Sequence, residues 1–155
     1  MDGGSPQRQE VELDELYRDI ILDHNRNPRN RGDIPKPTVS GEGYNPLCGD
    51  EVSLDLMIED GLIREARFRG NGCSISQSSA SMMTEAITGK TVEEAERLFS
   101  SFQEMLVAPA AEEAGDDLGD LEALYGVRKF PVRVKCATLA WHTLRDALVK
   151  YRKRA

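Results

Sequence analysis

The residues with the clearest chemical potential are three cysteines and one aspartate. Cys48 and Asp50 lie two positions apart with Gly49 between them. Thiolates and carboxylates both bind metal ions, and the glycine allows the backbone to turn so that both side chains face one ion. Because Cys-Gly-Asp also occurs in ordinary turns, the meaning of this segment depends on the other two cysteines, Cys73 and Cys136.

These two cysteines each lie close to an expected helix start. Cys73 precedes a helix whose beginning is marked by serines, and the last helix is expected to begin around Cys136. The N-terminal end of a helix stabilises a thiolate, which is both the nucleophile and the metal ligand. If the three sulfurs and the Asp50 carboxylate converge, they form a tetrahedral donor set that suits Zn²⁺. Because no Cys-x-x-Cys pair is present, inert buried cysteines are the alternative on spacing alone.

The charged and aromatic neighbours of these residues carry a weaker signal. Arg133 and Lys135, just before Cys136, would offset the negative charge of three thiolates and a carboxylate on one divalent ion, although a solvated basic edge is the simpler interpretation. His24 ends the first expected helix, where a structural role favoured by the helix dipole is the usual one. His142 falls about 240° around its helix from Cys136, so it is a poor ligand for the same ion.

Composition and charge restrict the class of protein. The chain has 155 residues, enough for one domain with a real core, and a formal net charge of -7, which opposes non-specific binding to nucleic acid. No apolar run approaches the roughly 20 residues of a membrane span, and the first ten residues lack the apolar segment of a signal peptide. The expected compartment is the cytoplasm, where three unpaired cysteines stay reduced.

A β-hairpin is the first element expected to position the site. Residues 52–58 alternate between apolar and polar side chains, as in a half-buried strand, and Asp60-Gly61 marks the turn. A two-residue loop in a regular hairpin would place arginines on the core face. We therefore expect a three-residue loop over residues 59–61, which pairs Leu54 with Ala66.

This hairpin register predicts that three candidate ligands meet at one end of the sheet. Extended beyond the strands, it sets Asp50 opposite Gly70. It also sets Cys48 opposite Gly72, which is the neighbour of Cys73.

Apolar periodicity predicts four longer helices. They are expected from just after Asp14 to near His24, from Ser74 to Gly89, from Thr91 to Leu106, and from about Cys136 to Tyr151. Thr91 and Glu94 match a capping box at the start of the third helix. Pro131 favours an extended approach to the last one.

The remaining segments define the domain organisation. Residues 1–10 are expected to form a disordered leader, and residues 11–155 a single domain. The segment 32–46, rich in proline and glycine, is expected to be an irregular crossing. Residues 108–127 have the composition of an inserted acidic loop, with a short helix near its end.

Four separated motifs then carry a resemblance to a known family. They are His-x-x-Asn-Pro-Arg-Asn at residues 24–30, Asn-Pro-Leu-Cys-Gly-Asp at 45–50, Gly-Cys followed by serines at 72–81, and Phe-Pro-Val-Arg-Val-Lys-Cys at 130–136. In this order they resemble the IscU/NifU-type iron–sulfur scaffold proteins, and most closely the SufU branch. The resemblance covers nearly everything from residue 13 to residue 151.

Two departures from the IscU pattern favour the SufU branch. IscU-like chains carry a histidine just before the third cysteine, where this chain has Lys135, and they lack an insertion such as residues 108–127. A protonated lysine has no lone pair for a metal ion, so a cluster cradle of three cysteines and that histidine is not available. The resemblance implies instead a tight zinc site formed by Cys48, Asp50, Cys73 and Cys136.

The resemblance also implies a fold and an activity. The fold is α+β, a small three-stranded antiparallel sheet with helices packed on it. SufU-like proteins are zinc-dependent sulfurtransferases, which accept persulfide sulfur from a SufS-type cysteine desulfurase and pass it to downstream SUF cluster assembly proteins. Carried over by position, Cys48 is the acceptor thiol, and Arg133, Lys135 and His24 are expected to bind the partner.

Two other functions remain open on the sequence. One is an iron–sulfur cluster scaffold that uses the same three thiolates. The other is a zinc-stabilised activator of the desulfurase that carries no sulfur itself. Neither nucleic acid nor membrane is expected as a partner.

Overall fold

The computed structural model describes residues 17–107 and 118–154. A helix runs through residue 26 and is followed by β1 (Val39–Asn45), β2 (Asp50–Glu59), β3 (Leu62–Asn71), α2 (Ser74–Ile87), α3 (Val92–Val107), the 3-10 helix η1 (Gly119–Lys129) and α4 (Pro131–Arg154). The expected leader, residues 1–10, and residues 108–117 of the expected insertion lie outside the described residues. None of the helices in the described part is long and apolar enough to cross a bilayer.

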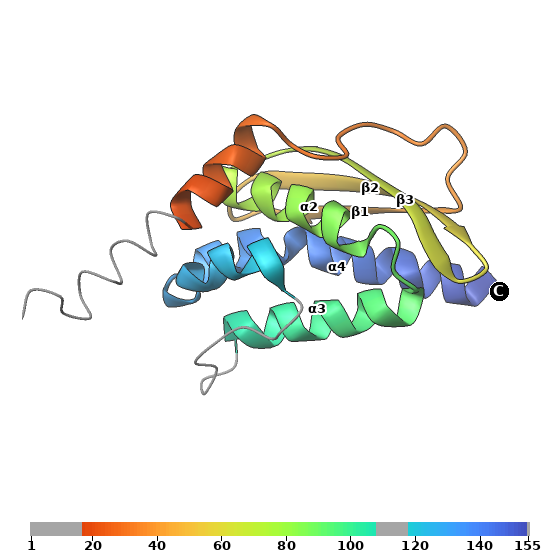
Figure 1. Cartoon of the computed structure of the whole chain (residues 1–155). Helices are drawn as coiled ribbons and strands as arrows, with labels where there is room; N and C mark the ends of the chain where they lie inside the picture. The colour runs from red at the N-terminus through yellow and green to blue at the C-terminus, as the bar shows by residue number, and fades with distance from the viewer. Residues whose placement is uncertain (1–16, 108–117, 155) are drawn as a thin grey trace, which may run out of the picture.

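The architecture is an antiparallel sheet, in the order β1-β2-β3, with helices packed against it. α4 contacts β1 and β2, α2 contacts β3 and α4, and α3 lies beyond α4 on the side away from the sheet (Figure 1). The expected fold class, α+β with a small three-stranded antiparallel sheet, is confirmed.

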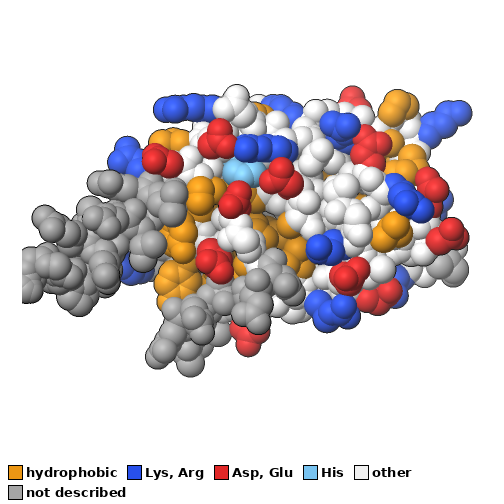
Figure 2. Space-filling view, viewed as in Figure 1, with side chains coloured by type: hydrophobic (Ala, Val, Ile, Leu, Met, Phe, Trp, Pro, Cys, Tyr) orange, Lys and Arg blue, Asp and Glu red, His pale blue; other side chains and the backbone are white. Residues whose placement is uncertain are grey.

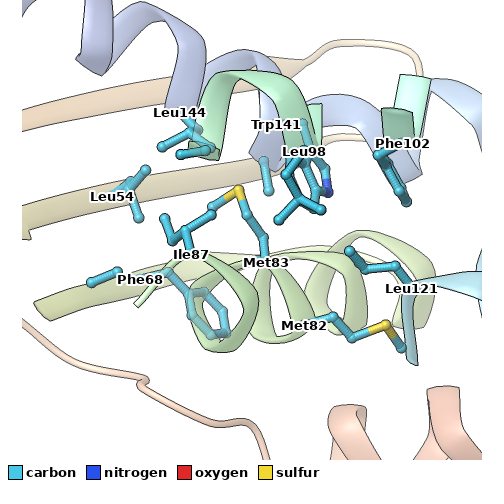
Figure 3. Close-up of a cluster of buried hydrophobic side chains, with 14 of the residues drawn as sticks. Leu54, Phe68, Met82, Met83, Ile87, Leu98, Phe102, Leu121, Trp141 and Leu144 are labelled. Carbon is cyan, nitrogen blue, oxygen red and sulfur yellow. The ribbon is translucent and has the colours of Figure 1, made fainter. Parts of the chain in front are cut away.

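The core lies between the sheet and the helices. Side chains from β2 and β3 meet those of α2, and Trp141 of α4 stacks on Phe102 of α3 with ring centroids 4.7 Å apart (Figure 3). Met82 and Met83 are fully part of this core, as their position on the apolar stripe of α2 suggests. Burying one side chain of this size stabilises the fold by roughly 1.5–3 kcal/mol, so the site rests on a rigid base.

The predicted hairpin register is wrong, although the predicted apolar face is correct. Asp60 and Gly61 both have positive φ (53° and 76°) and form a two-residue loop. The pairing then shifts by one residue at Arg64, which has no partner on β2, so Leu54 faces Phe68 and not Ala66. This bulge restores the alternation that a regular two-residue hairpin would lose.

The segment expected to be an irregular crossing contains an edge strand, β1, over residues 39–45. The periodicity misses it because two of its positions are glycines that lie against α4. A Cβ on Gly43 would lie 2.2 Å from Thr143 Oγ1, and one on Gly41 would lie 2.8 Å from the Thr143 carbonyl oxygen. The strand therefore packs through its backbone, which leaves no hydrophobic pattern in the sequence.

Two expectations about the C-terminal third also change. α4 begins at Pro131 rather than near Cys136, because proline is well tolerated in the first turn of a helix, where its missing N–H costs nothing. The short helix expected near the end of the inserted loop is present as η1, but this half of the segment is packed rather than open. Its apolar residues Leu118, Leu121, Leu124 and Val127 are buried in the core.

Candidate thiol and metal site

The loop between β1 and β2 presents Cys48 to solvent. Asn45 and Asp50 pair as the last and first residues of the two strands, and the turn between them is closed by the Gly49 N–H, which donates to the Asn45 carbonyl oxygen at 2.8 Å. Gly49 has a φ of 70°, which confirms the turn expected from this glycine. Cys48 is exposed, as a reacting thiol needs to be.

Asp50 lies directly below this loop and is completely buried. Its Oδ1 accepts a hydrogen bond from the Cys73 N–H at 2.9 Å, and its Oδ2 lies 3.9 Å from Cys73 Sγ. Cys73 is the N-cap residue of α2, which confirms its expected position at a helix start. Gly72 makes this approach possible, because a Cβ there would lie only 2.4 Å from Asp50 Oδ1.

Cys136 comes from the second turn of α4 and is also completely buried. Its Sγ lies 3.2 Å from Cys48 Sγ, and all three cysteines are free. Donor atoms of Cys48, Asp50 and Cys136 lie within 4.8 Å of one another. Cys73 stands beside this trio through its contact with Asp50, so the structure brings all four predicted ligands to one place.

The electrostatics of this cluster favour a bound cation. Burial, reinforced by the neighbouring Cys48 thiol, Asp50 and Cys73, raises the pKa of the Cys136 thiol well above its ordinary value. Without a cation, the Cys136 thiol therefore resists ionisation. A divalent ion reverses this preference, because a coordinating thiol is deprotonated. Sulfur and carboxylate donors on opposing elements fit Zn²⁺, which takes four such ligands in a tetrahedron.

Several exposed side chains lie on the segments that carry Cys48 and Cys136, here called the exposed rim. The predicted partner-binding residues Arg133 and Lys135 lie exposed on the first turns of α4. Sequence reasoning missed the apolar part of this rim, which consists of Tyr44, Leu47, Phe130 and Val132, each more than half exposed. Their signal was available, since three of them flank the cysteines within the same short motifs.

His24 is placed differently from the other predicted partner-binding residues. Its ring is only 1% exposed, and its Nδ1 lies 2.8 Å from Ser81 Oγ of α2. A role in partner binding stays a prediction, but the contacts that the structure gives this histidine are inside the protein. His142 is half-buried against Phe99, and burial lowers its pKa. Among the described residues, it is not part of the donor group at the thiol site.

Comparison with known proteins is consistent with this geometry. The family model of the NifU-like N-terminal domain matches residues 16–155. The chain is 45% identical over 138 residues to the zinc-dependent sulfurtransferase SufU of Bacillus subtilis, covering 89% of this chain and 92% of that protein. It is 42% identical over 136 residues to the iron–sulfur cluster assembly scaffold protein IscU of Streptococcus pyogenes, covering 88% and 84%.

A solved structure supports the same relationship. The crystal structure of a putative iron–sulfur cluster assembly scaffold protein for the SUF system from Fervidobacterium islandicum superposes with a TM-score of 0.77 at 35% identity. The match covers 83% of this chain and 93% of that one.

Proposed function

This chain belongs to the NifU-like N-terminal domain family, and from that premise we propose that it is a zinc-dependent sulfurtransferase acting with a SufS-type cysteine desulfurase. The observation that carries the proposal is the division of the cluster by exposure. Cys48 is exposed on a loop, whereas Asp50 and Cys136 are completely buried beneath it. One thiol can therefore meet a partner while the others hold an ion.

The proposed zinc ligands are Cys48, Asp50, Cys73 and Cys136. When bound, Zn²⁺ keeps the sulfurs deprotonated and therefore nucleophilic at neutral pH. The fold holds two of these ligands, Asp50 and Cys136, in place. Asp50 is held by the Cys73 N–H, and Cys136 is held by the second turn of a helix that packs across the sheet.

The proposed transfer is a thiol–persulfide exchange. The Cys48 thiolate attacks the terminal sulfur of a cysteine persulfide on the desulfurase. A new sulfur–sulfur bond forms on Cys48, the sulfur–sulfur bond of the donor breaks, and the donor cysteine leaves as a thiolate. The step needs no external oxidant or reductant, because one persulfide is consumed and one is made. Downstream SUF cluster assembly proteins would then receive this sulfur, in the cytoplasm, where such thiols persist.

The rim around Cys48 is the proposed docking surface for the desulfurase. Exposed Leu47 and Phe130 offer apolar contact, and exposed Arg133 and Lys135 offer positive charge. Aromatic and arginine side chains are enriched in protein interfaces, and charge complementarity mainly speeds and orients the encounter.

A cluster scaffold is the second candidate, because the relative from Streptococcus pyogenes bears that name. Lys135 weighs against it, since a protonated lysine cannot serve as a cluster ligand at that position. Metal analysis of protein purified without added metal separates the two functions. One zinc per chain and a colourless protein support transfer, whereas a brown, cluster-bearing protein supports the scaffold.

The carrier role is tested with a purified SufS-type desulfurase and ³⁵S-cysteine. Wild-type protein should take up label that is released by a thiol reductant, and Cys48→Ser should take up none. Ser74→Ala, a change of one hydroxyl close to Cys73, is the matched control and should label like wild type. Full labelling of Cys48→Ser would rule out Cys48 as the acceptor. Faster desulfurase turnover without any label on the wild type would identify a non-carrier activator.

A further inference from the structure

His24 is a buried histidine with one nitrogen left over. Its Nδ1 has a partner in Ser81 Oγ, but Nε2 has no hydrogen-bond partner among residues 17–107 and 118–154. A carboxylate oxygen, Asp120 Oδ2, lies 3.6 Å from Nε2, which is longer than a hydrogen bond. Leaving a buried polar atom without a partner costs roughly 1–3 kcal/mol, so this atom requires an explanation.

Two carboxylates from other elements lie close to the His24 ring. Glu85 comes from α2, and Asp120 comes from η1. Donor atoms of His24, Glu85 and Asp120 all lie within 4.8 Å of one another. Figure 2 shows acidic side chains gathered on the face where the N-terminal helix, α2 and η1 meet. With the proton on Nδ1, the Nε2 lone pair beside these carboxylates is electrostatically unfavourable unless a positive charge lies between them.

The other nitrogen of the ring, Nδ1, has the kind of partner that a metal-bound histidine usually has. Ser81 Oγ accepts a hydrogen bond from the Arg29 N–H at 2.8 Å and has a second lone pair for a proton on His24 Nδ1. This contact holds the ring, and in the tautomer with the proton on Nδ1 it leaves the Nε2 lone pair free on the side of Asp120. A metal-bound histidine almost always donates its other N–H in this way.

We propose that His24 Nε2, Glu85 and Asp120 form a second metal site, separate from the cysteine cluster, for a divalent first-row transition ion such as Zn²⁺. One imidazole and two carboxylates are borderline donors that suit such ions. A neutral histidine and two carboxylates also balance a 2+ charge. In a tetrahedral zinc site with ligands at about 2.0–2.1 Å, neighbouring donors lie about 3.4 Å apart, close to the 3.6 Å between His24 and Asp120.

The site would join three segments that are distant in sequence. It would tie η1, the packed second half of the acidic segment, to α2 and to the helix that ends at residue 26. Glu85 and Asp120 are exposed, so the ion can enter from solvent and complete its coordination with water. The inference does not rest on the proposed sulfur transfer, because none of its ligands belongs to the cysteine cluster.

The test is a zinc count at a buffered free Zn²⁺ concentration. Wild-type protein dialysed to equilibrium should hold two zinc ions per chain. Glu85→Gln and Asp120→Asn should each hold one, with affinity for the second ion lowered more than about tenfold, since even an outer-shell change costs about 10–100-fold. Glu59→Gln, which removes the same charge from the far β2–β3 turn, is the matched control and should hold two.

Crystals of the zinc-loaded protein locate the ion. Anomalous scattering at the zinc edge should show a peak between His24, Glu85 and Asp120. A wild type with no zinc outside the cysteine cluster, or a second zinc that both variants retain, would overturn the inference. A wild type with its only zinc at His24 would uphold it while refuting the cysteine site. Unfolding curves measured in a chelator check that the variants fold like wild type.

Discussion

Asp50→Asn should separate the metal-binding role of this residue from its structural role. Asparagine keeps the size of the side chain and an oxygen that can accept the Cys73 N–H, which Asp50 Oδ1 now accepts at 2.9 Å. What it loses is the negative charge and the strongest oxygen donor for a cation. The substitution therefore removes a ligand without removing the hydrogen bond that orders the Cys73 segment.

The two effects of this substitution have opposite signs. Loss of one direct ligand should lower zinc affinity by at least about 10–100-fold, the range for outer-shell changes, which corresponds to about 1.4–2.8 kcal/mol. The metal-free protein should be as stable as wild type or more stable. Asp50 is completely buried, and removing its charge spares the desolvation of a carboxylate that also disfavours the Cys136 thiolate.

Two assays measure these effects. Competition with a chromophoric chelator gives the zinc affinity, and urea unfolding in excess chelator gives the stability of the metal-free form. Unchanged zinc affinity would show that Asp50 is not a ligand. Metal-free protein destabilised by more than about 1 kcal/mol would show that the carboxylate is mainly structural, because that is the worth of a typical hydrogen bond.

Three further predictions follow from the same contacts. Gly72→Ala should destabilise the protein by roughly 1–3 kcal/mol in urea unfolding and weaken zinc binding, because the new methyl group would lie 2.4 Å from Asp50 Oδ1; an unaffected variant would mean that the Cys73 segment yields easily. Gly43→Ala should cost a similar amount through its clash with Thr143 yet leave zinc affinity unchanged; weaker zinc binding would refute the independence of this contact from the site. Because the pKa of the Cys136 thiol is raised in the folded protein, the unfolded chain loses this proton at a lower pH than the folded chain does. The free energy of unfolding of the metal-free protein should therefore fall as the pH rises above about 8.5, the ordinary pKa of a thiol. Cys136→Ser should abolish this part of the pH dependence.

The hairpin shows what alternation in a sequence can and cannot predict. The apolar face of β2 follows from the side chains alone, because successive residues point to opposite sides of a sheet. The register does not follow, since the two-residue loop and the bulge at Arg64 each shift the pairing by one residue and their effects on the apolar face cancel. Any even shift keeps the same face, so patterning cannot choose among such registers.

The elements that were missed lack a side-chain signal for a physical reason. β1 packs on α4 through Gly41 and Gly43, where a Cβ would clash. The short helix expected near the end of residues 108–127 is present as η1, but the burial of its leucines was not expected, because they are spaced among acidic residues. α4 begins five residues earlier than expected, because Pro131 is compatible with a first helical turn as well as with an extended approach.

The candidate thiol site was more predictable than the elements that carry it, and the exposure of its donors gives the reason. Donor chemistry is a property of residue types, so three cysteines and an aspartate indicate a sulfur–oxygen site whatever the register. Their division of roles is a property of the fold. Asp50 begins β2, Cys136 lies on a helix across the core, and Cys48 stands on the turn above them. Asp50 and Cys136 cannot move without disrupting the core, whereas Cys48 can. This arrangement lets one thiol react while the ion stays bound to the other donors.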